Sequence, residues 1–177
     1  MASQHLRARQ PKNFFLPYLF STLIQGHTMR YAHFIVAASL FAAGSAIAGP
    51  CDLEIESNDA MKFNKDSLSV PASCKKVTLK LVHTGKLPKA SMGHNWVLTK
   101  TADMQAVATD GIPAGADKGY LKPGDARVLA ATKLIGGGES DTISFDASKL
   151  KAGEGYSFFC SFPGHIGLMK GTFAVTK

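Results

Sequence analysis

Acidic residues are absent from the first 51 positions, since all 13 Asp and Glu residues follow Cys51. Residues 1–48 carry four basic side chains, whereas residues 49–177 carry 16 basic against 13 acidic side chains, a net charge of +3. This mild excess argues against a nucleic-acid-binding protein, which needs clustered Lys and Arg and a domain pI above about 9. The apolar content of 45% excludes a disordered chain. Residues 49–177 are long enough to bury the core of one domain.

Long hydrophobic runs are also missing. The apolar stretch that starts at Phe34 spans only ~15 residues, fewer than the ~20 that a membrane-spanning helix needs. Arg30 precedes it and Ala46-Ile47-Ala48 ends it, which is the order of charged, apolar and small residues in a secretory signal peptide. We predict a signal peptide over 29–48, export, and no stable membrane association after cleavage. Residues 1–28 are interpreted as an upstream extension, with translation starting at Met29.

Cysteine is scarce, with only Cys51, Cys74 and Cys160. An exported protein meets an oxidising compartment, so one disulfide is expected and an odd thiol remains. Cys51 and Cys74 lie near the predicted mature start, away from other metal-ligand residue types, and we expect them to pair, a bridge worth ~3 kcal/mol. Cys160 is left free. The alternative is three buried thiols.

Short alternating runs separated by Gly- and Pro-containing turns predict an antiparallel sandwich or barrel of short strands. The predicted strands are 53–56, 77–82, 95–99, 126–130, 142–145, 156–160 and 171–176. One helix is predicted over 102–108, with Thr101 or Asp103 at its N-terminus and Gly111 beyond its end. We find no internal repeat.

The free cysteine begins a C-x4-H-x3-M motif formed by Cys160, His165 and Met169. His94, at the start of a predicted strand, is the natural second imidazole. Two imidazoles, one thiolate and a weak thioether form a blue-copper ligand set, because soft sulfur suits Cu(I) and imidazole suits both oxidation states. Zinc also accepts Cys and His, but a thioether is a poor zinc ligand.

Other interpretations of these residues are weaker. Cys160 and His165 could be a nucleophile and its base, but no third orienting group is apparent and Met169 would have no role. Cys and Met are also common core residues, and each histidine alone could be structural. A copper oxidase or nitrite reductase needs further histidine-bound copper, whereas only His83 is left in 49–177. We therefore expect an electron carrier and not an enzyme. A structural sandwich domain, with or without zinc, is a second rival.

Residues 51–177 resemble the azurins, a family of bacterial cupredoxins. The similar segments are 92–98, 120–123, 132–136, 158–165 and 168–171. The resemblance implies an all-β, cupredoxin-like Greek-key sandwich or barrel of about eight strands with one short helical flap. It implies one type 1 copper held by His94, Cys160 and His165, with Met169 and the backbone carbonyl of Gly93 as axial contacts. It also supports the Cys51–Cys74 pairing.

The resemblance further implies a periplasmic one-electron carrier that serves redox proteins such as cytochromes c and reductases. Asn95 and backbone N–H groups in the Ser161–Phe162 stretch are candidate hydrogen-bond donors to the Cys160 sulfur. His165 would be the residue through which electrons enter and leave the site. His83 would be a histidine that links the reduction potential to pH. An apolar docking patch is expected around His165, formed by Leu87, Met92, Ile112, Pro113, Phe162 and Ile166.

Overall fold

The computed structural model describes residues 49–177, which form two β-sheets. The first sheet has the strand order β2-β1-β4-β7, made of β1 (Asp52–Asn58), β2 (Lys62–Phe63), β4 (Lys76–His83) and β7 (Ser140–Asp146). The second has the order β3-β9-β8-β5-β6, made of β3 (Ser67–Pro71), β5 (Val97–Lys100), β6 (Ala130–Ala131), β8 (Tyr156–Phe159) and β9 (Lys170–Thr176). The expected all-β sandwich is therefore confirmed.

The strands alternate because one face of each sheet is buried. Along β4, Val77, Leu79 and Leu81 are buried, while Lys76 and Lys80 are exposed. Trp96 is fully buried between the sheets, with its ring centroid 6.0 Å from that of Phe158 and 6.2 Å from that of Phe173. These aromatic side chains form part of the core between the two sheets.

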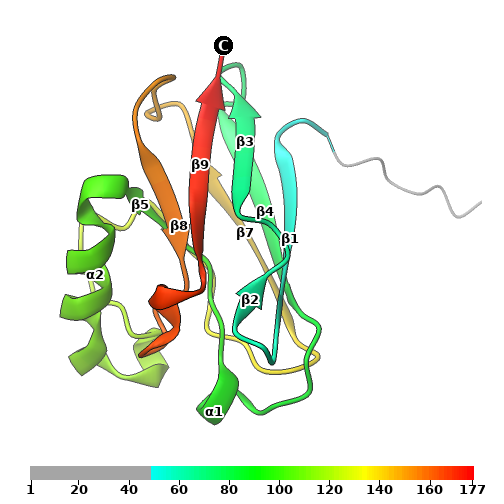
Figure 1. The fold of residues 1–177 in the computed structure, drawn as a ribbon. Helices are drawn as coiled ribbons and strands as arrows, with labels where there is room; N and C mark the ends of the chain where they lie inside the picture. The colour runs from blue at the N-terminus through cyan, green and yellow to red at the C-terminus, as the bar shows by residue number, and fades with distance from the viewer. Residues whose placement is uncertain (1–48) are drawn as a thin grey trace, which may run out of the picture. The chain divides into compact units, whose positions relative to one another are not determined.

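Helices lie at one end and one flank of the sandwich (Figure 1). The four-residue α1 (Lys89–Met92) lies at the end opposite the C-terminus, and α2 (Met104–Gly111) lies beside β8. Val107 and Ala108 of α2 are buried against Val97 and Phe159. Short 3-10 turns extend α2 on both sides, and another, η4 (His165–Gly167), lies between β8 and β9.

The structure corrects several expectations. The sheets are mixed and not purely antiparallel, because β1 pairs with β4 and β3 with β9 in parallel. The strand predicted over 126–130 is limited to Ala130–Ala131, since Ala126 and Arg127 lie in a turn. The predicted helix starts later, at Met104, and Gly111 is its last residue. The strands β2 and β3 and the helix α1 were not predicted.

Cys51 and Cys74 form the predicted disulfide, with 5.7 Å between their Cα atoms, and Cys160 is a buried free thiol. Within residues 49–177, no helix is long and apolar enough to cross a membrane. The predicted signal peptide and the upstream extension lie outside the described residues.

Candidate metal centre

His94 is held by backbone hydrogen bonds before β5 begins. Its N–H donates to the carbonyl of Ile135 (3.0 Å), and its own carbonyl accepts from the Ile135 N–H (2.9 Å). The imidazole Nε2 lies 2.9 Å from the carbonyl of Asn58. A carbonyl only accepts hydrogen bonds, so Nε2 carries the proton and the Nδ1 lone pair is free to bind a metal.

Gly93 lets this segment pass close to its neighbours. A Cβ atom at this position would lie 2.5 Å from the Lys89 carbonyl oxygen and 3.1 Å from the Leu134 side chain. Only glycine fits without a shift of the backbone. The Gly93 carbonyl oxygen lies 3.9 Å from the Cys160 sulfur, on the inner side of the site.

The other candidate ligands lie on the short connection from β8 to β9. The Cys160 N–H donates to the Met169 carbonyl (3.0 Å), and the Met169 N–H donates to the His165 carbonyl (2.8 Å). Gly164 has φ 85° and ψ −17°, a left-handed conformation that favours glycine and starts the η4 turn. These bonds fold Cys160, His165 and Met169 into one compact loop, and all three residues are buried.

Three ligand atoms converge. The Cys160 sulfur lies 3.8 Å from His94 Nδ1 and 3.7 Å from His165 Nδ1, and the two nitrogens are 3.2 Å apart. Ligands about 2.0–2.3 Å from a single ion, as in zinc–nitrogen and zinc–sulfur bonds, are separated by about 3.5–3.7 Å when the ion lies in their plane. The two sulfur–nitrogen distances match this spacing, and the two nitrogens lie about 0.3 Å closer than it, so the three residues fit a single metal ion of this size after a small adjustment.

Burial sets the protonation of these groups. It lowers the pKa of His94 to about 4 and also lowers the pKa of His165, because an imidazolium loses hydration in this site. Both rings are therefore neutral at pH 7 and can bind a metal without first losing a proton. Burial raises the pKa of the Cys160 thiol to about 11, so a metal must displace its proton.

Hydrogen bonds link Asn95 and Ser161, the residues that follow His94 and Cys160. Burial raises the pKa of Cys160, and the nearby backbone N–H groups of Asn95 and Phe162 partly offset this by stabilising the thiolate. The Asn95 side chain does not contact the sulfur: its Oδ1 accepts from the Ser161 N–H (2.9 Å), and its Nδ2 donates to the Gly119 carbonyl (3.1 Å). The Ser161 hydroxyl also donates to that carbonyl (2.6 Å). The sequence indicated only backbone N–H groups of the Ser161–Phe162 stretch, and the role of the Ser161 hydroxyl was missed; the small polar side chain beside the cysteine was the available signal.

We expect Asn95→Leu to shift the reduction potential of the copper-loaded protein, because the bonds that position Ser161 and Gly119 would be lost and the N–H groups facing the sulfur would move. Direct electrochemistry would measure the shift. Thr132→Val is the matched control, since Thr132 also anchors the neighbouring backbone through the Trp96 N–H but makes no bond to Ser161. An unchanged potential in Asn95→Leu would contradict this positioning role.

Apolar side chains are found around the site. The Phe162 ring stacks on His165, with centroids 4.4 Å apart. Ile112, Phe162 and Ile166 line one small cleft next to Cys160. Leu87 and Ile112 are 42% and 47% exposed, Pro113 is exposed, and Met92 is half-buried. Leu168, 65% exposed and next to Met169, was missed from the sequence.

His83 lies behind His94. Their rings stack with centroids 4.5 Å apart, and His83 is fully buried. Its Nε2 lies 2.9 Å from the Met92 carbonyl, and its Nδ1 accepts the Gly85 N–H at 3.0 Å. The ring thus connects the metal-binding end to the loop that carries Leu87.

Residues 49–176 match the family model of copper-binding proteins of the plastocyanin/azurin family, and the chain belongs to this family. It is 61% identical over 136 residues to azurin of Bordetella pertussis, covering 76% of this chain and 91% of that protein. It is 56% identical over 140 residues to azurin of Pseudomonas aeruginosa, covering 78% and 95%. It is also 60% identical over 122 residues to azurin of Alcaligenes faecalis, covering 69% and 95%.

Proposed function

We propose that the chain is a periplasmic electron-transfer protein that binds one type 1 copper through His94, Cys160 and His165 and is not an enzyme. Met169 and the Gly93 carbonyl would be additional, weaker contacts to the bound copper. The observation that carries this proposal is the convergence of a buried free thiol and two neutral imidazoles within 4.8 Å of one another. Bound copper would supply a one-electron couple between its cupric and cuprous states.

The protein's contribution is to keep the ligands in place. His94 is fixed by its bridge to Ile135 and its bond to Asn58, and Cys160 by its backbone bond to Met169. Because the ligand atoms are already close together, a change of charge at the site requires little movement of the chain. Burial of all three ligands excludes water from the site.

Copper titration tests this function. Adding Cu(II) to the purified protein should give an intense blue absorption at one equivalent, which ascorbate should bleach reversibly. A colourless protein at full copper occupancy would refute the proposal. Zinc is the informative control, since a structural zinc domain would gain stability from zinc but show no reversible redox change.

The proposed docking patch, through which electrons reach His165, is apolar. It consists of the exposed residues Leu87, Ile112 and Pro113 and the half-buried residues Met92, Phe162 and Ile166. A small apolar patch suits transient redox encounters, which bury less than about 1,200 Å². The partners we propose are redox proteins of the cytochrome c and periplasmic reductase types.

We expect Met92→Lys to slow electron self-exchange between two copies by on the order of tenfold at low salt, because two patches that meet would each carry a new like charge. NMR line broadening of mixed oxidation states would measure the rate. Ala152→Lys adds the same charge at the exposed turn before β8, at the far end of that strand from Cys160, and should change the rate much less. Equal rates in Met92→Lys and the unaltered protein would reject the patch.

Export is proposed to use a signal peptide over 29–48, preceded by an extension over 1–28 and followed by a single copper-binding domain over 49–177. N-terminal sequencing of the periplasmic protein should start at Gly49, and another start would refute the cleavage site.

His83 is proposed to link the potential to pH, because protonation of its Nδ1 would break the bond from Gly85 and add positive charge beside His94. The potential should then fall as pH rises. His83→Gln should flatten that dependence, and a dependence that survived this substitution would reject the role of His83.

A further inference from the structure

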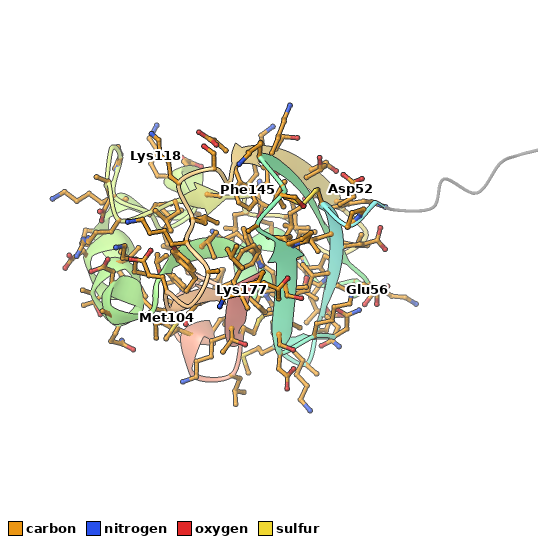
Figure 2. The ribbon with its side chains drawn as sticks, turned by 90° about the horizontal axis from the view of Figure 1, so that it is seen from above. Asp52, Glu56, Met104, Lys118, Phe145 and Lys177 are labelled. Carbon is orange, nitrogen blue, oxygen red and sulfur yellow. A yellow bond between two sulfur atoms is a disulfide. The ribbon has the colours of Figure 1, made fainter. Side chains whose placement is uncertain are left out.

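A hollow of about 420 Å³ opens beside the metal-binding end. Its lining residues are Lys89, Ala116, Asp117, Lys118, Gly119, Ala131, Thr132, Lys133 and Leu134. Three lysines face it against one aspartate, and all four of these side chains belong to exposed residues. The three lysines come from α1, from the segment after α2 and from the segment after β6, so folding brings together charges that are far apart in the sequence. Figure 2 shows Lys118 at the periphery of the domain.

These lysines form no ion pair with a carboxylate within residues 49–177. Within the part of the chain that the structure describes, the basic side chains in ion pairs with carboxylates are Lys80, Lys100, Arg127 and, when protonated, His83. Lys89, Lys118 and Lys133 take part in none of these pairs. With three lysines against Asp117, the hollow keeps a net positive charge that attracts an anionic group from solution.

The hollow is connected to the metal centre by direct contacts. The Gly119 carbonyl at its edge accepts hydrogen bonds from Asn95 and Ser161, the residues that follow His94 and Cys160. Leu134, which also lines the hollow, precedes Ile135, the backbone partner of His94. Gly119 and Leu134 would therefore lie between a ligand in the hollow and the residues that hold the metal.

We propose that this hollow receives carboxylate side chains of an acidic redox partner. The inference rests on the proposed electron-transfer function and adds the chemistry of the partner surface. Lysine suits such an encounter, because flexible point charges steer association without a fixed bidentate geometry. Charges at the rim of an interface mainly set the association rate and its salt dependence. The apolar patch would then permit close approach, while the hollow selects for acidic proteins.

The test uses the copper-loaded protein and one haem partner in two charge states: a lysine-rich cytochrome c, and the same cytochrome after succinylation, which converts its lysines to carboxylates. We expect Lys118→Gln/Lys133→Gln to lower the rate of electron transfer with the succinylated form about tenfold at low salt. The loss should largely disappear at about 1 M salt, where charges are screened beyond about 3 Å. The rate with the unmodified form should not fall.

Lys75→Gln/Lys76→Gln is the matched control. It removes the same charge at the start of β4, whose other end carries His83 beside His94, about 20 Å away at the usual rise per residue. Its rate should fall less than twofold. Equal losses in the two double variants would show that the rate depends only on the net charge of the protein, which would overturn the proposal. No loss in either variant would also overturn it.

A second measurement separates a protein partner from a small anion. Hexaglutamate peptide should shift the backbone NMR signals of Lys118 and Lys133 in the copper(I) protein at concentrations where inorganic phosphate does not. If phosphate shifted these signals equally, the hollow would be a site for small anions and not a docking surface for a protein. Every variant must stay blue and reducible, so a colourless protein would refute the proposed function, whereas a blue protein without lysine dependence would refute only the acidic partner.

Discussion

Cys160→Ser is expected to abolish the intense blue absorption and the rapid electron exchange of the copper-loaded protein. Cys160 supplies the one buried thiol among residues 49–177, and a serine oxygen cannot replace its soft thiolate. Copper uptake should also change. Since burial raises the thiol pKa to about 11 and both histidines are neutral, binding at pH 7 should release about one proton per copper in the unaltered protein and none in the variant.

Visible spectroscopy and a pH-stat titration in unbuffered solution would measure both effects. Cys51→Ala/Cys74→Ala is the control, because it removes two sulfur atoms but leaves the site intact. That variant should lose about 3 kcal/mol of stability and remain blue. A Cys160→Ser variant that kept the blue band would show that the sulfur is not the ligand.

The copper-free protein is expected to lose roughly 3 kcal/mol of stability between pH 6.5 and pH 4. Burial lowers the pKa of His94 to about 4 in the folded state, whereas the unfolded chain takes up this proton near pH 6.5. The unfolded state therefore binds more protons in this window, so the free energy of unfolding falls as the pH falls. His165, whose pKa burial also lowers, contributes with the same sign.

Denaturant unfolding at a series of pH values would measure the effect. His94→Gln removes the main group that titrates in this window and should flatten the profile, even though the variant starts from a lower stability. If the profiles of the two proteins were parallel, acid destabilisation would have to come from other groups.

The ligands could be predicted from the sequence because their chemistry is rare and local. Cys160, His165 and Met169 share one short loop, and the count of three histidines in residues 49–177 left few choices for the fourth ligand. Their convergence could not be derived from the spacing alone. It depends on the antiparallel pairing of β5 with β8 and on the hydrogen bonds between Asn95 and Ser161, which bring the segment of His94 to the loop.

The strand pairing could not be predicted from the sequence for a similar reason. The alternation in β1 and β4 shows which residues face the core but not that the two strands run parallel. The strand β3 was missed although Leu68 and Val70 alternate with serines, because the run is short and ends at Pro71. The role of the Ser161 hydroxyl was missed because its partners, the Asn95 side chain and the Gly119 carbonyl, are brought near only in the folded chain.

The strand β9 leads directly away from the metal centre. It begins one residue after Met169 and ends at Thr176, seven residues that cover about 20 Å, and Figure 1 shows the C-terminus at the opposite pole from α1. A linker fused after Lys177 could therefore attach the molecule to an electrode or a carrier enzyme, leaving its redox-active face turned toward solution.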